Sequence, residues 1–388
     1  MLISKGETAC APAAVGYDAA RLDVLNDHLA GLVSGGKIQC ATYCIARRGK
    51  IIAHNGIGRQ SYRAEDMREV PHDAIQYIAS ITKIFTATAI MKLVEDGKLR
   101  LDQPVADILP QFKKPPFAAI SIFHLLTHTS GMHPDGGCFP DEPAVSQWAL
   151  IGHAYLQHKE GDFDWIEASL ENGVRMAPGK EWAYCSFGFC ILGAVIAKIT
   201  GMRAEAYIEN FIAKPLGLLD TSFSIDKAKA ARWIVHNEEL YNAIHHEQTP
   251  EAPWDGIPST GGGLNSTAYD LLRFGQCIMN KGTLDGVRIL GKKAVEKMIT
   301  PAIHNVPDYC WSANTPSRGF GIGFDMRNGP AFTFSADTFN HEGAGACALY
   351  ADPTEELVAA WIVPFADSDW HPEALWNVQN IIWSGVIE

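Results

Sequence analysis

The sequence predicts an α/β chain of the α+β type, in which an antiparallel sheet formed from both chain ends is flanked by helices. Runs typical of strands lie near both ends, and helical periodicity dominates the middle. We therefore expect a sheet domain from residues 1–100 and 310–388, with a mainly helical domain at 101–309 inserted between its halves. The length of 388 residues and the 47% share of hydrophobic residues suit a globular chain with a sizeable core.

The N-terminal elements follow from periodicity and turn residues. Leucines recur at helical spacing over 18–33, and the glycine pair 35–36 ends this helix. Residues 40–47 and 50–57 are predicted to form a hairpin, because β-favouring runs flank a short polar turn. A second helix is predicted over 81–95, where apolar side chains share one face.

The middle and the C-terminal part differ in their predicted elements. Helical patterns occur at 187–199, 203–213, 268–280 and 291–299. Successive strands are predicted at 319–326, 331–336, 344–351 and 356–364, with a closing helix at 371–385. The stretch 138–182 is acidic, irregular and rich in tryptophan: Trp148, Trp165 and Trp182. Core packing is one interpretation of these tryptophans, and a variable lid or wall for an apolar acyl group is the alternative.

Charge and cysteine content exclude several classes of protein. The 44 acidic and 32 basic residues give a net charge of −12, which argues against nucleic acid or an anionic membrane surface as partner. The nine cysteines are irregularly spaced and form no C-x-x-C, so we expect reduced thiols. No signal-peptide or transmembrane pattern is present, and a cytoplasmic location is expected unless a leader has been removed.

No metal or organic cofactor is expected. His124 and His128 are four residues apart, like two metal ligands on a helix, but no glutamate follows His124 to complete H-E-x-x-H. The glycine-rich run 319–324 lies in a strand-like segment and opens no helix, so it is not expected to bind a nucleotide.

A serine and a lysine three residues apart can form a nucleophile and its base. They lie on nearly the same face of a helix, and a desolvated lysine can take the hydroxyl proton. The pattern Ser-x-x-Lys occurs three times, at Ser34, Ser80 and Ser224. Only Ser80 stands at the start of a strong helical pattern, so Ser80 and Lys83 are the candidates.

Four further segments follow Ser80-x-x-Lys83 in order. They are IFHLLTHTSG at 122–131, PGKEWAYCSFGFCILG at 178–193, STGGGLNSTAYDLLRF at 259–274 and HEG at 341–343. Together they closely resemble the serine β-lactamase-like family, which holds class C β-lactamases, D-alanyl-D-alanine carboxypeptidases, D-aminopeptidases, esterases and acyl transferases. The resemblance runs from about residue 78 to residue 350 and is specific for the family, though not for a substrate.

The resemblance implies a role for each matching residue. Ser80 is the acylated nucleophile, Lys83 its base partner, and Tyr184 the group that assists proton transfer. Substrate-binding positions are Ser186, His341, Gly343 and Ala344, of which Ala344 would supply a backbone N–H to the oxyanion hole beside that of Ser80. A lysine cation next to Tyr184 would favour its phenolate, and the two would titrate as a unit, so the sequence does not decide which is the base.

Two departures from the family pattern bear on the substrate. Tyr184-Cys-Ser186 has serine where penicillin-processing members often have asparagine, and His341 stands where K-T-G would place a lysine cation. The activity we expect is therefore ester hydrolysis or acyl transfer on small to medium acyl groups.

Two alternatives stay open from the sequence. One is a peptidase or amidase: a D-aminopeptidase, a D-alanyl carboxypeptidase or a β-lactamase. The other is a non-catalytic binding or sensor protein. An α/β-hydrolase is not expected, because no G-x-S-x-G occurs.

Overall fold

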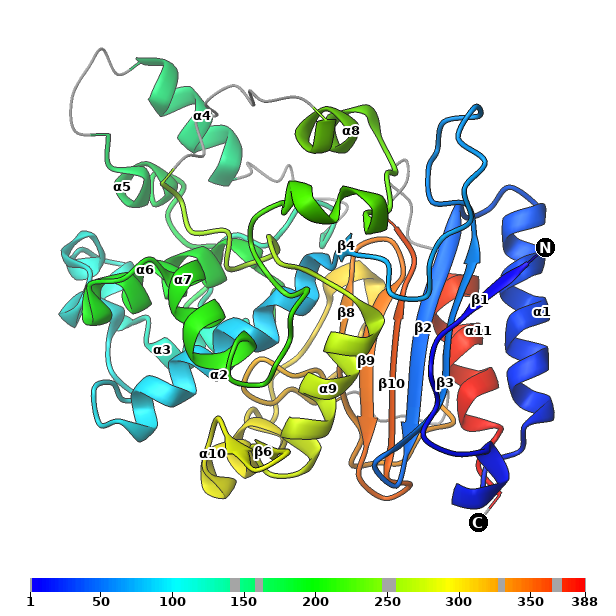
Figure 1. Cartoon of the computed structure of the whole chain (residues 1–388). Helices are drawn as coiled ribbons and strands as arrows, with labels where there is room; N and C mark the ends of the chain where they lie inside the picture. The colour runs from blue at the N-terminus through cyan, green and yellow to red at the C-terminus, as the bar shows by residue number, and fades with distance from the viewer. Residues whose placement is uncertain are drawn as a thin grey trace.

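A six-stranded antiparallel sheet forms the centre of the computed structural model (Figure 1), which describes residues 2–139, 147–157, 163–245, 256–326, 332–364 and 372–387. The strand order is β1-β3-β2-β10-β9-β8. The bounds are β1 Ile3–Lys5, β2 Cys40–Arg47, β3 Lys50–Gly58, β8 Phe339–Gly343, β9 Cys347–Asp352 and β10 Leu357–Ile362. Both chain ends contribute strands, and the predicted fold class is confirmed.

The central strands alternate between two buried faces. In β10, Leu357, Ala359 and Trp361 enter one core cluster. Val358, Ala360 and Ile362 enter the other. This period of two places successive side chains on opposite faces of the sheet, and both faces are apolar because both are covered.

Helices α1 (Ala20–Ser34) and α11 (Pro372–Trp383) cover one face and pack against each other, as Figure 1 shows on the right. The sequence predicted helices at 18–33 and 371–385. Helix α9 (Ala268–Met279) covers the other face, against β10, β2 and β9. A Cβ at Gly275 would stand 2.8 Å from a methyl of Leu349, so this glycine lets α9 approach the sheet.

The helical region continues beyond α9 on the same side of the sheet (Figure 1). Helix α2 (Thr82–Glu95) lies at its centre and is buried on almost every side over Thr82–Met91. It contacts α6 (Ser186–Thr200), α7 (Ala204–Ile208) and the π-helical turn η6 (Glu209–Ala213). The other helices are α3 Ile122–Leu126, α4 Gln147–Gln157, α5 Trp165–Ser169, α8 Glu238–His245 and α10 Lys292–Met298.

Small elements complete the chain. Two-stranded sheets pair β4 (Gln76–Tyr77) with β5 (Asn265–Ser266) and β6 (Thr283–Leu284) with β7 (Val287–Arg288). The 3-10 turns are η1 Pro12–Val15, η2 Ala79–Ile81, η3 Val105–Asp107, η4 Pro110–Lys113, η5 Phe117–Ala119, η7 Lys227–Arg232 and η8 Cys310–Ser312. Within the described ranges no single helix is long and apolar enough to cross a membrane; the bent pair of α6 with α7 and η6 passes by length and composition only.

Two predicted strands are wrong, and local pattern did not predict β8 or the short strands β1, β4, β5, β6 and β7. Residues 319–326 form a tight loop in which Gly321 N–H donates to Phe324 O, and Gly321 lies directly against Met298 O. The described part of the predicted strand 331–336 has no strand pairing. The edge strand β8 (FNHEG) was missed because its polar letters lack the alternation that marks a strand.

Candidate active site

Ser80 lies where the chain passes from β4 into α2. It is the middle residue of η2 and is half-buried, while its neighbours Ala79 and Ile81 are buried. Ala79 holds a left-handed φ of 47°. Such a conformation is costly for alanine and occurs where surrounding structure imposes it. The turn leaves Ser80 partly exposed at the N-terminal end of a buried helix.

Lys83 places its amine directly beside that hydroxyl. Its Nζ lies 2.9 Å from Ser80 Oγ and donates to Gly261 O at 2.6 Å. The side chain has no exposed surface. Burial lowers the pKa of Lys83 from 10.5 to about 8, against an opposing effect of the Asp135 carboxylate. Roughly a tenth of Lys83 is therefore neutral at pH 7, and that fraction can accept a proton.

The glycine-rich segment at 259–264 closes the site over α2. Thr260 O accepts from Thr86 Oγ1 at 2.7 Å, and Leu264 N–H donates to Thr82 Oγ1 at 3.0 Å. A Cβ at Gly261 would stand 2.6 Å from Ser186 O, so only glycine fits between α2 and α6. The sequence singled out this segment but not its function as acceptor for the lysine.

Tyr184 completes a cluster with Ser80 and Lys83. The side chains of Ser80 and Ser186 interact with its hydroxyl, and Lys83 Nζ lies 4.9 Å from its ring centroid. Burial, helped by Asp135, raises the pKa of Tyr184 well above 10. Burial is the largest influence on both pKa values and favours the neutral form of both groups, so the predicted coupling between the lysine cation and the phenolate stays a prediction.

Ser186 is held by a carboxylate that sequence reasoning missed. Asp135 accepts from Ser186 N–H at 2.7 Å and from Ser186 Oγ at 2.5 Å, while its own N–H donates to Tyr184 O at 2.8 Å. Asp135 follows HTSG by four residues. This nearness to the motif was the available signal. The spacing does not show that the segment after HTSG meets the Tyr184-Cys185-Ser186 element.

Strand β8 brings His341 and Gly343 against the turn that bears Ser80. A Cβ on Gly343 would stand 2.4 Å from Ile78 O and 3.4 Å from the Ala79 side chain. His341 is buried, with Nδ1 2.7 Å from Glu342 O. Ala344 follows in an exposed turn. The strand therefore reaches the turn of Ser80 through glycine, and the His341 side chain is buried.

Aromatic rings surround Tyr184. His128 stacks on it at 4.4 Å between centroids and accepts from Cys185 N–H at 3.0 Å. Burial and the nearby Lys83 lower the pKa of His128 well below 6.5, so the ring is neutral. Trp311, which the sequence hardly distinguished, lies 5.3 Å from Tyr184 with 55% of its surface exposed.

The three tryptophans of 138–182 lie in two different environments. Trp148 and Trp165 pack on Phe187, with centroids 5.5 Å and 5.7 Å away. Trp182 is buried beneath Tyr184 at 5.8 Å. Residues 140–146 and 158–162 of the predicted lid lie outside the described residues.

Histidine and cysteine side chains serve structural purposes. His124 takes part in the capping box of α3 with Ser121. All nine cysteines are free thiols, as expected. In the part of the chain that the structure describes, no cluster of three potential ligands is placed to hold a metal.

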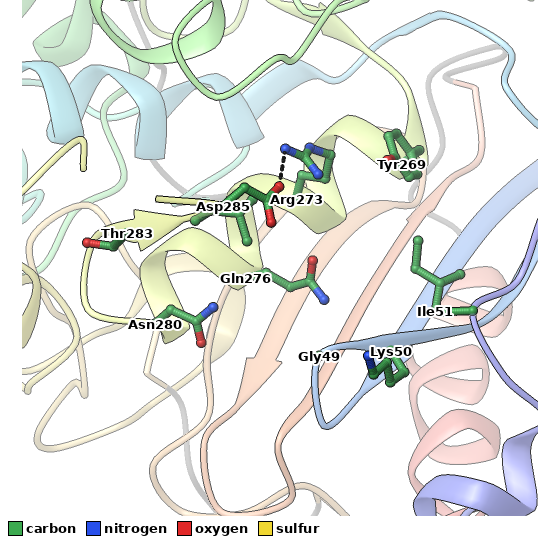
Figure 2. A pocket seen from close by; sticks show the side chains of 11 residues that line it. Gly49, Lys50, Ile51, Tyr269, Arg273, Gln276, Asn280, Thr283 and Asp285 are labelled. Atoms are coloured by element: carbon green, nitrogen blue, oxygen red, sulfur yellow. Dashed lines mark hydrogen bonds and ion pairs between the residues drawn. The ribbon is translucent and has the colours of Figure 1, made fainter. Parts of the chain in front are cut away.

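A separate groove lies between α9 and the turn joining β2 to β3 (Figure 2), with a volume of about 380 Å³. Its lining includes Lys50, Arg273, Gln276 and Asn280 but none of the predicted site residues. Arg273 is paired with Asp285 at 2.8 Å, the dashed contact in Figure 2.

Two relatives align with a large part of the chain. Protein Rv1367c of Mycobacterium tuberculosis is 30% identical over 366 residues, covering 86% of each chain. Esterase EstB of Burkholderia gladioli is 32% identical over 299 residues, covering 66% of this chain and 68% of its own.

Solved structures share the fold at lower identity. The hydrolase EstCE1, described as having promiscuous acyltransferase activity, superposes with a TM-score of 0.73 at 19% identity, covering 94% of this chain and 98% of its own. A penicillin-binding protein homologue from Caulobacter crescentus has a TM-score of 0.70 at 20% identity, with 95% and 98% covered.

The family model named Beta-lactamase matches residues 25–374, which includes every residue of the cluster around Ser80. Members of this family are serine hydrolases, esterases among them. With Lys83 beside Ser80 and strand β8 against the turn that bears Ser80, the chain belongs to the Beta-lactamase family.

Proposed function

We propose that this protein hydrolyses, or transfers the acyl group of, uncharged carboxylic esters through an acyl-enzyme on Ser80. The observation that carries the proposal is the amine of Lys83, 2.9 Å from a half-buried serine hydroxyl, with its pKa lowered to about 8 by burial. A serine hydroxyl becomes an effective nucleophile when such a base is in contact with it.

Acylation follows from the positions of these groups. Ser80 Oγ attacks the ester carbonyl, and its proton passes to the neutral amine of Lys83, which becomes an ammonium. As the tetrahedral intermediate collapses, the Tyr184 hydroxyl protonates the departing alkoxide, and the Lys83 ammonium returns a proton to Tyr184. The products are an alcohol and the Ser80 ester, with Lys83 and Tyr184 again neutral. Water or an alcohol then reverses these steps to release the acyl group.

The oxyanion of the intermediate needs two donors. We assign the backbone N–H groups of Ser80 and Ala344 to it, on opposite sides of the acyl carbonyl. The contact of Gly343 with Ile78 and Ala79 supports this assignment, because it brings the end of β8 against the nucleophile turn.

Charges around the site favour uncharged substrates. Lys83 is fully buried, and Arg318 is paired with Asp325 at 2.6 Å and Asp308 at 3.4 Å. Neither presents a cation to a substrate carboxylate, and His341 is buried. Asp135 adds negative charge beside Ser186, which would repel an anionic substrate there. β-Lactams and peptide C-termini carry such a carboxylate, so esters fit better.

The first test compares p-nitrophenyl butyrate with a chromogenic cephalosporin on the wild type and on Ser80→Ala. We expect rapid ester turnover, weak cephalosporin turnover, and loss of both in Ser80→Ala. Cephalosporin turnover equal to that of the ester would refute the ester preference. Ester turnover that survives in Ser80→Ala would refute the nucleophile.

Labelling by a fluorophosphonate separates an enzyme from a binding protein. The wild type should be modified at Ser80, located by peptide mass, and Ser80→Ala should not. Absence of labelling in the folded wild type would favour a non-catalytic role.

A further inference from the structure

We propose that Asp135 is a positioning residue that holds Tyr184 as a proton donor and sets the pH range in which the Lys83–Tyr184 pair works. This inference rests on the proposed function, since it concerns the proton transfers at Ser80.

The contacts of Asp135 enclose the Tyr184-Cys185-Ser186 element from both sides. Its backbone N–H donates to Tyr184 O at 2.8 Å. Its two carboxylate oxygens accept from Ser186 N–H at 2.7 Å and from Ser186 Oγ at 2.5 Å. A hydrogen bond to a charged acceptor is shorter and stronger than one between neutral groups. The loop after α3 therefore fixes both ends of the element that carries Tyr184.

The number of available protons decides which group donates in the contacts between Asp135, Ser186 and Tyr184. A serine hydroxyl has one proton to donate, and Ser186 gives it to Asp135. Ser186 Oγ then has only its lone pairs left for the neighbouring Tyr184 hydroxyl, and we infer from this proton count that the Tyr184 hydroxyl is the donor between the two. When an ester occupies the site, that hydroxyl turns from Ser186 to the leaving-group oxygen. Asp135 thus keeps Tyr184 protonated until the leaving group departs.

The carboxylate also acts through its charge. It raises the pKa of both Lys83 and Tyr184, opposing the effect of burial on the lysine and adding to it on the tyrosine. The other ionisable groups facing the pair are Cys138, Cys185, Cys190, Cys310, His128, His341 and Arg318. Burial raises the pKa of Cys185 and of Cys190 to about 12, and it keeps His128 neutral. His341 and Arg318 remain in every variant below, so they cannot cause a difference between variants.

The test is the pH dependence of fluorophosphonate labelling at Ser80 in the wild type and in Asp135→Asn. Removing the carboxylate charge lowers the pKa of the base, so the midpoint of the labelling rate should fall by about 0.5 to 1 pH unit. The ratio of the rate at pH 6 to the rate at pH 9 then rises about three- to tenfold. Labelling needs no turnover of a particular ester, so the choice of substrate does not enter.

Asp164→Asn is the matched control. Like Asp135, Asp164 accepts hydrogen bonds at the start of a helix, here from the backbone N–H groups of Ile166 and Glu167 in α5, without contacting Tyr184. Its midpoint should stay at the wild-type pH. A folded Asp135→Asn that labels more slowly at an unmoved midpoint would overturn the inference and leave Asp135 a purely structural anchor.

Ser186→Ala provides a second measurement should Asp135→Asn fail to fold. This change removes the acceptor that orients the Tyr184 hydroxyl. Turnover of ethyl butyrate, whose leaving group needs a proton, should fall at least about fivefold more than turnover of p-nitrophenyl butyrate. Equal losses would overturn the inference. Failure of the wild type to label at Ser80 would overturn the proposed function, and this inference with it.

Discussion

The pattern Ser-x-x-Lys occurs in three places in this chain, and its surroundings differ sharply among them. At Ser80 the lysine is fully buried and bonded to both the serine and Gly261. At Ser34 the serine donates to Gly31 O at the end of α1, while Lys37, 55% exposed, pairs with Glu373. At Ser224 both the serine and Lys227 are exposed at the start of η7.

The difference shows where the chemistry of the pair comes from. Burial lowers the pKa of Lys83 to about 8, because α2 and the 259–264 segment exclude water from its amine. The surface lysine Lys37 is solvated and is held by a carboxylate instead. A spacing of three residues places the two groups close together at the start of a helix. Packing by distant segments lowers the pKa of the lysine in the copy at Ser80.

The largest expected effect is that of Lys83→Met. It removes the base and should lower kcat/KM for p-nitrophenyl butyrate by about 10²–10⁴-fold. Urea unfolding should show no loss of stability, since a buried amine is replaced by an apolar side chain of similar length. Lys37→Met and Lys227→Met are the controls and should keep activity within about twofold. If Lys83→Met kept a tenth of wild-type activity, the proposed difference between Lys83 and the lysines of the other two Ser-x-x-Lys patterns would be refuted.

Gly343→Ala tests the contact between β8 and the nucleophile turn. The new methyl would stand 2.4 Å from Ile78 O, so the turn or the strand must shift. Displacement of this kind should lower kcat about 10- to 100-fold. In Gly31→Ala the methyl meets nothing within 4 Å, and α1 should gain about 0.5–1 kcal/mol. Full activity in Gly343→Ala would mean that the strand does not position the nucleophile.

The pH profile measures the state of Lys83 directly. Its pKa in the folded protein is lowered to about 8, and only the neutral amine accepts the Ser80 proton. Below that pH, kcat/KM should fall about tenfold per pH unit, and above it the rate should level off. A flat profile from pH 6 to pH 9 would contradict the assignment of Lys83 as base.

Trp311→Ala is expected to have the smallest effect and to act on binding. The exposed indole lies 5.3 Å from the Tyr184 ring, and we expect it to contact the acyl group of a substrate. KM for esters with large apolar groups should rise about three- to tenfold, with little change in kcat. Trp376→Ala, in α11 on the other face of the sheet, removes another partly exposed tryptophan and should leave KM unchanged. An unchanged KM in Trp311→Ala would show that the indole does not contact the substrate.

Regular elements were the most predictable part of the fold. Helices α1, α2, α9 and α11 and strands β2, β3 and β10 lie close to the ranges expected from periodicity. The errors gather where local pattern is weak. The loop at 319–326 is apolar like a strand but is folded on itself by its glycines, whereas β8 is polar yet paired with β9. Strand pairing is non-local, so a five-residue window does not contain it.

The candidate site likewise contains residues that were predicted and residues that were missed. The family resemblance assigned Ser80, Lys83, Tyr184, Ser186, His341, Gly343 and Ala344, and the structure places Lys83 and Tyr184 in contact with Ser80 and Gly343 against the turn before it. Asp135 and Gly261 were missed. Each bonds to a partner about 50 or more residues away, and neither residue type signals that contact.

By itself, the sequence determined the fold class, the family and the pair Ser80–Lys83, because periodicity, ordered motifs and a three-residue spacing are local properties of a chain. Only the tertiary structure decided which Ser-x-x-Lys is buried, that Tyr184 is held neutral, and that Asp135 closes the network at Ser186. The physical reason is that a pKa depends on desolvation and on nearby charges. Both arise from segments that are distant in sequence and meet only in the folded protein.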